Sequence, residues 1–481
     1  MAMATLGHPG DPDIRGLSAD SRTVGPGFLF AALAGSRADG VRFVDEAIRR
    51  GAAAVLASDR AAAALRPLGV PIIADPNPRR RLAAIAARFH GPQPDHLVAV
   101  TGTSGKTSVA WFVREIWRLL GIDAGSLGTL GVIAPGLHRL LAHTTPEPIT
   151  LHARLAELKQ RRVEHVVLEA SSHGLDQFRL DGLRLAAAAF TNLTQDHYDY
   201  HPTPAHYRRA KFRLFDALLP AGATAVLNAD SPEYPALAAI AAARGLRVLG
   251  YGRAGRDLGL VQARAVAAGQ TLVVAAGGRE WNVRLPLAGT FQAHNALAAV
   301  GLVTATGTPV PAALDALPRL EGVPGRLQQA AVLANGARVY VDYAHKPDAL
   351  ETVLVAARAL ARGRLVLVFG CGGDRDRAKR PLMGRIAARL ADRVYVTDDN
   401  PRSEDPGAIR RAILAACPDA VEVGDRAQAI EHAIAQLRDD DVLVVAGKGH
   451  EQGQIVGPIT VPFDDVAVVR DIVANLKGGT P

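Results

Sequence analysis

The hydrophobic residues of this chain gather in short segments that are apolar throughout, separated by longer amphipathic segments. Between residues 97 and 230 the apolar segments are LVAVTG (97–102), HVVLEA (165–170), AAAAFTNL (186–193) and TAVLNAD (224–230). Strands that are apolar on both faces are typical of a parallel sheet covered by helices on each side, whereas half-exposed strands alternate apolar and polar residues. The pattern therefore predicts an α/β fold with parallel strands.

The same alternation of apolar and helix-like segments occurs on either side of this region. Residues 17–90 combine segments such as GFLFAAL and RRRLAAIAARFH, and the chain beyond residue 328 contains RVYVDYA, RLVLVFGCGG, DRVYVTDD and DVLVVAGKG. Proline and glycine in HGPQPDH (90–96) and LEGVPGRLQ (320–328) interrupt the pattern and indicate linkers. A chain of 481 residues suits about three domains. We expect domains at 1–95, 96–323 and 324–481, the last of doubly wound type.

Composition changes this picture little. Hydrophobic residues make up 48% and charged residues 21% of the chain, as in an ordinary globular protein. No apolar run approaches the roughly 18 residues of a membrane span, and the first residues lack the features of a signal peptide, so we expect a cytoplasmic protein without membrane insertion. Two cysteines without ligand-like spacing argue against a disulfide framework or structural zinc. The net charge of +8 comes from scattered arginines, so we expect no nucleic-acid partner.

Lysine is rare in this chain, because only seven of the 55 basic residues are lysine. Five of the seven lie in glycine-rich or polar clusters: Lys106, Lys211, Lys346, Lys379 and Lys448. Arginine offers neither a compact ammonium group nor an amine that deprotonates readily. Where lysine is kept in an arginine-rich chain, its particular chemistry is therefore a candidate reason.

Polar or glycine residues follow the carboxyl ends of the later strands. These segments are 102–107, 169–173, 192–197, 370–375, 398–402 and 447–451. Open parallel sheets bind ligands at that edge. We therefore expect the chemistry in a cleft between the second and third domains.

The segment HLVAVTGTSGKTSVAWFVREIW (96–117) combines a strand, a glycine loop and an amphipathic helix. Backbone N–H groups in such a loop surround a phosphate, the lysine reaches the outer phosphates, and the final hydroxyl binds Mg²⁺. The loop residues are Gly102, Thr103, Ser104, Gly105, Lys106 and Thr107. The alternative is a plain strand-to-helix turn, but the coincidence of all three features favours a P-loop. Val100 stands where general P-loops carry glycine, which disfavours typical GTPases, motors and small-molecule kinases.

Three further positions are candidates for metal chemistry. Glu169 ends one buried strand, and Asp196 and His197 follow another. A carboxylate and an imidazole at neighbouring strand ends could complete a Mg²⁺ site, although such residues are often only caps or surface groups. Lys211, in YRRAKFRLF, could equally lie on the solvent face of an amphipathic helix.

Taken together, these motifs resemble the Mur ligase family, the ATP-dependent amide-forming enzymes of peptidoglycan precursor synthesis. The segments that carry the resemblance are GTSGKT, LEASSHGL, TNLTQDHYDYH, YRRAKFRLF, GTFQAHNALAA, PGRLQ, VDYAHKPDALE, GCGGDRDRAKRPLMG, DDNPR and AGKGHE, preceded by LSADSRTVGPGFLFAAL. They cover nearly the whole chain. The resemblance implies a small N-terminal α/β domain that binds the UDP substrate, a central P-loop ATPase domain with a parallel sheet, and a C-terminal Rossmann-like domain that binds the amino acid.

Within the family, the resemblance is greatest to the branch that adds meso-diaminopimelate. It implies that ATP phosphorylates the D-glutamate carboxylate of UDP-N-acetylmuramoyl-L-alanyl-D-glutamate, and that the amine of meso-diaminopimelate then displaces phosphate. Because two anions must approach each other, catalysis needs positive charge. The resemblance assigns it to Lys106 and two Mg²⁺ ions, one held by Thr107 and the other by Glu169 and His197. It also implies that CO₂ carbamylates Lys211 into a Mg²⁺-binding carboxylate, and that the enzyme is a monomer.

The resemblance also assigns the residues that bind the substrates. Those for ATP, beyond the P-loop, are Asn295, Arg326 and Asp342. Those for the UDP-muramoyl dipeptide are Ser21, Thr144, Thr145, Ser171, Gln177 and Arg179, while Ser36 and Arg37 depart from the His or Gln expected nearby. Those for diaminopimelate are Arg375, Asp399, Asn400, Pro401, Arg402, Gly447 and Glu451. Diaminopimelate differs from lysine by a distal carboxylate, which Arg402 and Asn400 suit, while Glu451 suits the distal ammonium.

Three other functions stay open from the sequence. A sister ligase that adds L-lysine or D-Ala-D-Ala, or a folylpolyglutamate synthetase, would share the P-loop but would not need DDNPR with an upstream GGDRD. A nucleotide-binding regulator without turnover would not need Lys106, Glu169, His197 and Lys211 together. A P-loop kinase would yield a phosphorylated product in place of an amide.

Overall fold

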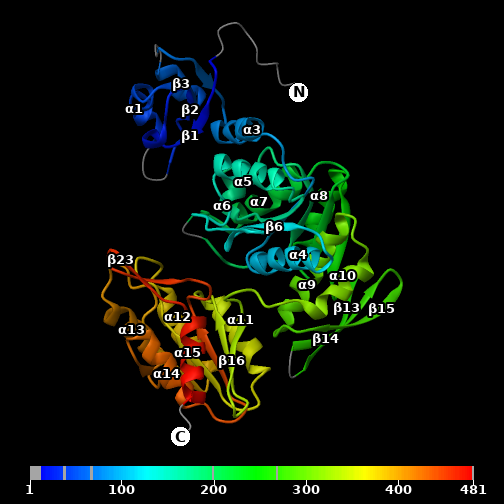
Figure 1. The fold of residues 1–481 in the computed structure, drawn as a ribbon, viewed down its shortest axis with the longest axis vertical. Helices are drawn as coiled ribbons and strands as arrows, with labels where there is room; N and C mark the ends of the chain where they lie inside the picture. The colour runs from blue at the N-terminus through cyan, green and yellow to red at the C-terminus, as the bar shows by residue number, and fades with distance from the viewer. Residues whose placement is uncertain (1–11, 36–38, 66–68, 198–199, 267–268, 479–481) are drawn as a thin grey trace. The chain divides into compact units, whose positions relative to one another are not determined.

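The computed structural model describes residues 12–35, 39–65, 69–197, 200–266 and 269–478. Ser36 and Arg37 therefore lie outside the described residues. The chain forms two compact units, Met1–Leu249 with Gly301–Gly307, and Gly250–Val300 with Thr308–Pro481 (Figure 1). Strand β12 (Arg247–Gly252) and helix α9 (Thr290–Ala305) each contain residues of both units.

The first unit begins with a small parallel sheet. Its strand order is β1 (Gly16–Ser18), β2 (Phe28–Ala31), β3 (Ala52–Ala57) and β4 (Ile72–Ala74), and its helices are α1 (Val44–Arg49), α2 (Asp59–Ala64) and α3 (Pro78–His90). Phe30 and Val55 belong to one apolar cluster, and Leu29 and Leu56 to another. Since successive side chains point to opposite faces, both faces of this sheet are apolar. The predicted small N-terminal α/β region is confirmed.

A larger sheet follows in the first unit, in the order β11-β10-β5-β9-β6-β7-β8. Strands β5 (His96–Thr101), β6 (Ala124–Gly128), β9 (His165–Glu169), β10 (Leu185–Phe190) and β11 (Thr224–Asn228) are parallel, whereas β7 (Gly131–Ala134) and β8 (Leu137–Arg139) are antiparallel. The helices are α4 (Lys106–Leu119), α5 (Pro148–Gln160), α6 (Ser172–Asp176), α7 (Pro204–Arg213) and α8 (Tyr234–Ala243). All four strands predicted for this region are confirmed.

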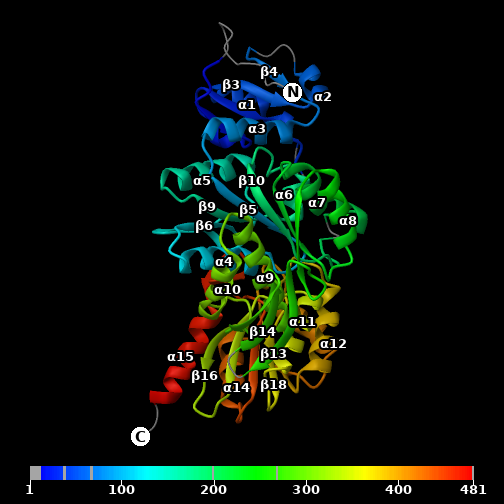
Figure 2. The same cartoon turned by 90° about the vertical axis from the view of Figure 1, so that its right-hand side faces the viewer.

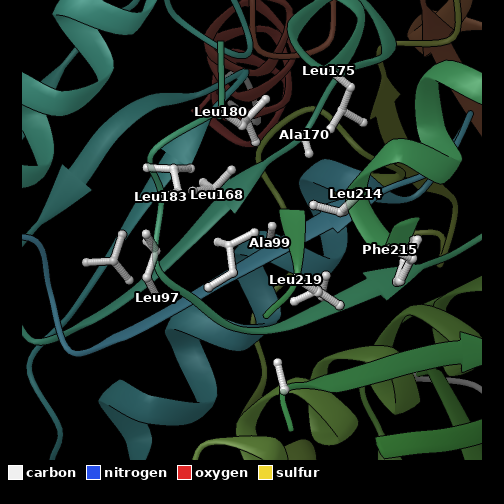
Figure 3. Packing of buried hydrophobic residues seen from close by; sticks show 14 of the residues in the cluster. Leu97, Ala99, Leu168, Ala170, Leu175, Leu180, Leu183, Leu214, Phe215 and Leu219 are labelled. Carbon is white, nitrogen blue, oxygen red and sulfur yellow. The ribbon is translucent and has the colours of Figure 1, made fainter. Parts of the chain in front are cut away.

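The core of this sheet explains why its strands are apolar throughout. Figure 3 shows Leu97 and Ala99 of β5 beside Leu168 of β9, together with Leu214 and Phe215, which follow α7. All are buried. Because β5 pairs in parallel with both β9 and β10, the carboxyl ends of these three strands lie at one edge of the sheet, and the residues that follow them build the candidate site.

The second unit contains an antiparallel hairpin region and a parallel sheet. Strands β13 (Leu258–Val266), β14 (Gly269–Ala276) and β15 (Arg279–Leu285) are antiparallel, and α10 (Val310–Ala316) follows in the chain. Gly277 and Gly278 join β14 to β15 with φ of 59° and 74°. Two successive positive φ angles are what a two-residue hairpin turn of the primed type requires, and glycine adopts them readily.

The C-terminal sheet has the order β16-β17-β21-β18-β19-β20. Its strands are β16 (Gln328–Val332), β17 (Arg338–Asp342), β18 (Leu365–Phe369), β19 (Arg393–Val396), β20 (Val421–Glu422) and β21 (Val442–Ala446), and only β16 runs antiparallel to its neighbour. Helices α11 (Pro347–Arg358), α12 (Lys379–Leu390) and α13 (Pro406–Leu414) contribute to one apolar face. Figure 2 shows α11 and α12 side by side next to β18. Helices α14 (Arg426–Ala435) and α15 (Asp465–Gly478) contribute to the other, and the hairpin β22 (Gly453–Val456) and β23 (Ile459–Pro462) lies between them in the chain.

The predicted doubly wound C-terminal region is therefore confirmed. Within the described ranges, none of the helices combines the length and the apolar character needed to cross a bilayer.

Candidate active site

The glycine loop after β5 has the backbone of a phosphate-binding turn. Gly102 has φ of +147° and Gly105, the N-cap of α4, has φ of +86°. A Cβ on Gly102 would lie 1.9 Å from Thr191 Oγ1, so the loop packs directly against the segment after β10. Asn192 Oδ1 accepts a hydrogen bond of 2.9 Å from the backbone N–H of Ser104. The loop is therefore braced, and it opens a helix as a P-loop must.

Lys106 curls back onto this loop. Its Nζ donates to the carbonyl oxygens of Gly102 and Thr103, each at 2.9 Å. Main-chain carbonyls are weaker partners for an ammonium group than phosphate oxygens. Lys106 is thus held at the loop by contacts that a triphosphate would replace.

A set of oxygen atoms surrounds the start of α4. The hydroxyl of Thr107 donates to Glu169 Oε2 at 2.9 Å, and Thr129 donates to the same carboxylate through its N–H at 2.8 Å and its hydroxyl at 3.1 Å. Glu169 is buried, and Gly128 leaves it room, because a Cβ on Gly128 would lie 2.2 Å from Glu169 Oε1. Carboxylate and hydroxyl oxygens are ligands that Mg²⁺ prefers. The residue chemistry therefore fits this ion.

Thr129 was missed by the sequence analysis. It follows β6 and contacts Glu169 forty positions later, with Thr144 Oγ1 at 3.2 Å from its hydroxyl. The only signal in the sequence was its place after a short glycine-rich segment, GSLG.

Lys211 is buried, not solvent-exposed. Its side chain lies in the first unit with a relative exposure of 1%, and its Nζ donates to the carbonyl of Gly102 at 2.7 Å. The same Nζ lies 4.5 Å from the ring centroid of Tyr207, one turn earlier on α7. The solvent-face interpretation of Lys211 is therefore wrong, because α7 packs this side of its surface against the P-loop.

Tyr207 links the parts of this region. Its hydroxyl lies 3.0 Å from Thr103 Oγ1, and its ring lies 6.3 Å from that of His197, centroid to centroid. His197 follows β10 with φ of +55°, and its Nε2 lies 3.3 Å from Asp196 Oδ2. The structure thus brings His197, Lys211 and the P-loop together around one aromatic ring that the sequence analysis did not single out.

A hydrogen-bonded chain supports the loop that carries His197. Asp176 Oδ1 lies 3.4 Å from His206 Nε2, and the two Nδ1 atoms of His206 and His201 are 2.9 Å apart. Tyr200 donates to Asp176 Oδ2 at 2.8 Å. Burial lowers the pKa of His201 to about 4, so its ring is neutral near pH 7. Asp176, His201 and His206 also form a group of potential metal ligands. The hydrogen bond between the rings of His201 and His206 accounts for their proximity without an ion.

The residues predicted for the UDP-muramoyl dipeptide form a second network in the first unit. Thr145 donates its hydroxyl to the backbone oxygen of Glu169 at 2.7 Å and accepts from the N–H of Ser171 at 2.9 Å. Arg179 donates to the Thr145 carbonyl at 2.7 Å and to Gln177 Oε1 at 2.8 Å. Five of the six predicted residues, including Thr144, therefore lie around the end of β9.

Ser21 belongs to the small N-terminal sheet region. Its hydroxyl donates to Glu46 Oε2 at 2.8 Å, and its side chain is buried. Its role in binding stays a prediction.

The residues predicted for ATP in the second unit have structural partners. Both oxygens of the buried Asp342 carboxylate accept backbone N–H groups, from Leu327 at 2.6 Å and Ala344 at 2.7 Å. Burial raises the pKa of Asp342 to about 6. The guanidinium of Arg326 lies 4.7 Å from the ring centroid of Tyr343. Asn295 Nδ2 donates to the side chain of Gln292 at 3.1 Å.

All of the residues predicted for diaminopimelate except Arg375 follow β19 and β21, which flank β18 in the C-terminal sheet. Asn400 Nδ2 donates to Glu451 Oε2 at 2.9 Å. Arg402, with φ of +53°, donates to the carbonyl of Gly373 at 2.9 Å. Gly447 has φ of +120°, and a Cβ there would lie 2.5 Å from Asp399 Oδ2.

Arg375 and Pro401 complete this set. Pro401 is buried beside Asn400, and its carbonyl lies so close to Gly373 that a Cβ on that glycine would approach it to 1.9 Å. Arg375 is exposed on the loop after β18 and donates to the carbonyl of Asp374 at 3.1 Å. Arg375 is thus a surface residue here, whereas Asn400, Arg402 and Glu451 are at least partly buried.

The parallel sheet around β5 and the glycine loop at residues 102–107 are those of a P-loop nucleotide-binding protein. Family models match the chain as the Mur ligase family catalytic domain at residues 13–90, the Mur ligase middle domain at 100–303 and the Mur ligase glutamate ligase domain at 325–449. The chain belongs to the Mur ligase family.

Individual relatives extend over the same length. The chain is 52% identical over 473 residues to the UDP-N-acetylmuramoyl-L-alanyl-D-glutamate–2,6-diaminopimelate ligase of Agrobacterium fabrum, covering 98% of this chain and 96% of the relative. A solved structure with that same ligase name superposes with a TM-score of 0.72 at 32% identity, covering 97% and 96% of the two chains. The MurF ligase of Thermotoga maritima in complex with ADP has a TM-score of 0.64 at 18% identity, covering 98% and 100%, and shares the fold.

Proposed function

We propose that this chain is an ATP-dependent ligase that joins meso-diaminopimelate to the D-glutamate carboxyl group of UDP-N-acetylmuramoyl-L-alanyl-D-glutamate, in peptidoglycan precursor synthesis. The observation that carries this proposal is the 52% identity over nearly the full length to a 2,6-diaminopimelate ligase. The site geometry is consistent with it, because a P-loop and a carboxylate with hydroxyl neighbours occur in one unit, and the hydrogen-bonded pair of Asn400 and Glu451 occurs in the other.

The nucleotide would bind at residues 102–107. Backbone N–H groups at the N-terminus of α4 would face the phosphates, and Lys106 would exchange the Gly102 and Thr103 carbonyls for phosphate oxygens. Asn295, Arg326 and Asp342 are the proposed further contacts to ATP.

Two Mg²⁺ ions are part of this proposal. Thr107 would hold one ion, and Glu169 and His197 would hold the other, with Lys211 as a further ligand once it is carbamylated. When bound, Mg²⁺ supplies positive charge that offsets the repulsion between a carboxylate and a triphosphate. An unmodified lysine has no acceptor for a cation. Carbamylation, in which the Lys211 amine and CO₂ give a carbamate and release one proton, would turn Lys211 into an oxygen ligand.

The reaction then needs two displacements. An oxygen of the D-glutamate carboxylate attacks the γ-phosphorus of ATP, the bond to ADP breaks, and an acyl phosphate forms. The neutral amine of diaminopimelate attacks the acyl carbon, phosphate leaves, and the amine loses a proton as the amide forms. Both steps depend on alignment, which is worth several orders of magnitude in rate when the reacting groups are held together. Ser21, Thr144, Thr145, Ser171, Gln177 and Arg179 are the proposed contacts that hold the UDP-muramoyl dipeptide.

The choice of amino acid would rest on the C-terminal sheet. Arg402 and Asn400 would meet the distal carboxylate of diaminopimelate, and Glu451 would meet its distal ammonium. Arg375, Asp399, Pro401 and Gly447 are the other proposed residues of this site. The division at 1–95, 96–323 and 324–481, the cytoplasmic location and the monomeric state also remain proposals.

The deciding experiment measures phosphate release and the amide product with ATP, the UDP-muramoyl dipeptide and a panel of amines. We expect turnover with meso-diaminopimelate at least tenfold faster than with L-lysine, and none with D-Ala-D-Ala. Faster incorporation of L-lysine would contradict the choice of substrate. No phosphate release in the presence of every substrate would favour a regulator without turnover.

A further inference from the structure

Lys448 is a buried cation beside the proposed amino-acid site. It follows β21 between Gly447 and Gly449, which have φ of +120° and +58°, and its side chain is 0% exposed. Its Nζ donates to Asn400 Oδ1 at 3.1 Å and to Glu451 Oε2 at 3.2 Å. Burying an ammonium group is costly unless it has partners of this kind. The burial of Lys448 therefore depends on Asn400 and Glu451, the two residues next to it that are proposed to bind substrate.

The contacts of Lys448 determine which way the Asn400 amide points. Asn400 Oδ1 accepts from Lys448 Nζ and from the backbone N–H of Ile455 at 2.9 Å, which uses both of its lone pairs. Asn400 Nδ2 donates one hydrogen to Glu451 Oε2. The reversed amide would place its NH₂ group against two donors. The amide therefore keeps its NH₂ group on the side of Glu451. The second hydrogen of that group can donate to a ligand.

The same contacts give the two oxygens of the Glu451 carboxylate different surroundings. Oε2 accepts from both Lys448 and Asn400, whereas neither of these bonds involves Oε1. Glu451 is only partly buried, so Oε1 can receive a ligand. The result is a hydrogen-bond donor on Asn400 next to an acceptor on Glu451.

We propose that Lys448 is a positioning residue that orients Asn400 and Glu451 to recognise a zwitterionic amino-acid centre. The Asn400 donor suits the carboxylate of such a centre, and the Glu451 acceptor suits its ammonium. A terminal amine without a carboxylate, as in L-lysine, uses only the Glu451 side of the pair. The inference deepens the proposed function and rests on it, because it assumes that the distal centre of diaminopimelate binds here.

The first test replaces Lys448 by methionine, which keeps most of the side-chain length without donors. We expect KM for meso-diaminopimelate to rise at least tenfold, while KM for ATP and for the UDP-muramoyl dipeptide changes less than twofold. Lys448→Gln, which keeps a donor on a shorter side chain, should recover part of the loss. The control is Lys159→Met. Lys159 lies in the first unit, where it pairs with Asp95 and Glu164, so its replacement should leave all three KM values unchanged.

The second test separates positioning from general support of the fold. In an Asn400→Ala background, Lys448→Met should add less than a further twofold to KM for diaminopimelate, because the amide it orients is gone. Asn400→Asp keeps the shape and both contacts of Oδ1 but removes the donor, so it should raise the same KM even if Lys448→Met does not fold.

Two results would overturn the inference. Equal increases in all three KM values for Lys448→Met and Lys448→Gln would assign Lys448 to the fold alone. An unchanged KM for diaminopimelate in Lys448→Met, with an increase in Asn400→Ala, would show that Asn400 binds without it. If Asn400→Ala and Glu451→Gln also have no effect while diaminopimelate is still incorporated, the substrate centre binds elsewhere, and the inference fails although the proposed reaction stands.

Discussion

The side-chain nitrogens of Lys106 and Lys211 both donate to one carbonyl oxygen, that of Gly102, at 2.9 and 2.7 Å. These two lysines are far apart in the sequence, one at the start of α4 and the other near the end of α7. Two cations at one acceptor repel each other, and the repulsion is stronger away from water. The arrangement therefore suits the proposed function, in which negative charge would come from a triphosphate near Lys106 and from carbamylation at Lys211.

Lys211→Arg tests the proposed carbamylation. Arginine keeps the positive charge but does not form a carbamate under these conditions, so we expect turnover to fall at least 100-fold, in line with the loss of an essential electrostatic group. Circular dichroism should show an unchanged fold. Lys211→Ala should regain part of its activity when short carboxylic acids are added. Full phosphate release by the arginine variant would refute carbamylation as a requirement.

Thr129 should support the proposed Mg²⁺ site through Glu169. Thr129→Val removes the hydroxyl that donates to Glu169 Oε2 but keeps the backbone N–H bond to Oε1. Loss of one hydrogen bond to a charged group costs about 1.5–3 kcal/mol, or roughly tenfold to 100-fold in apparent Mg²⁺ affinity. The measurement is phosphate release against Mg²⁺ concentration. Thr129→Ser keeps the hydroxyl and is the matched control, so equal behaviour of the two variants would argue against this role.

Arg426 and Asp465 should stabilise the second unit. Their side chains are both 0% exposed and form a pair at 2.8 Å, with two parallel hydrogen bonds. Removing one partner of a buried pair leaves an uncompensated charge, so Arg426→Met should lower the free energy of unfolding by about 3–5 kcal/mol. Urea unfolding followed by far-ultraviolet circular dichroism measures this change in the free energy of unfolding.

An exposed ion pair provides the matched control for that measurement. Arg411 and Asp405 lie 3.2 Å apart with side-chain exposures of 69% and 63%. Arg411→Met should cost no more than about 1 kcal/mol, because water screens such pairs. Equal losses from the two arginine variants would contradict the role assigned to burial.

Stability should fall as the pH drops from 6.5 toward 4. Burial lowers the pKa of five histidines from 6.5 to about 4: His152, His165, His201, His345 and His450. Between these pH values the unfolded chain binds protons that the folded chain does not, so stability is complete above pH 6.5 and is lost on acidification. Two carboxyl groups oppose this trend, because burial raises the pKa of Asp342 to about 6 and also raises the pKa of Asp398, so the folded state keeps their protons. Five imidazoles outweigh two carboxyl groups.

Thermal unfolding between pH 4 and 8 checks this expectation. The midpoint temperature should decrease from pH 6.5 to pH 4.5. His152→Phe removes the histidine ring that is buried at 2% exposure, and should reduce the slope of that decrease. A midpoint that stays constant or increases on acidification would show that these rings are not held neutral by the fold.

Most strands and the phosphate loop were predictable from the sequence, because each depends on neighbouring residues. Strands β5, β9, β10 and β11 are apolar throughout, and the loop at 102–107 joins glycines to a lysine and a hydroxyl. The antiparallel strands β13, β14 and β15 were not predicted. Many of their exposed residues are polar, among them Arg264, Thr271 and Asn282, and their pairing depends on turns such as Gly277–Gly278, so the signal of a buried sheet is missing.

The sequence by itself determined the α/β fold, the P-loop and the groups of residues at strand ends, since local patterns of hydrophobicity and glycine carry that information. Only the tertiary structure decided that Lys211 is buried against Gly102, that Thr129 contacts Glu169 and that Lys448 orients Asn400. Those contacts join residues 40 to 109 positions apart. Their geometry depends on how helices and strands pack, and a linear pattern does not record which side of a helix another segment will cover.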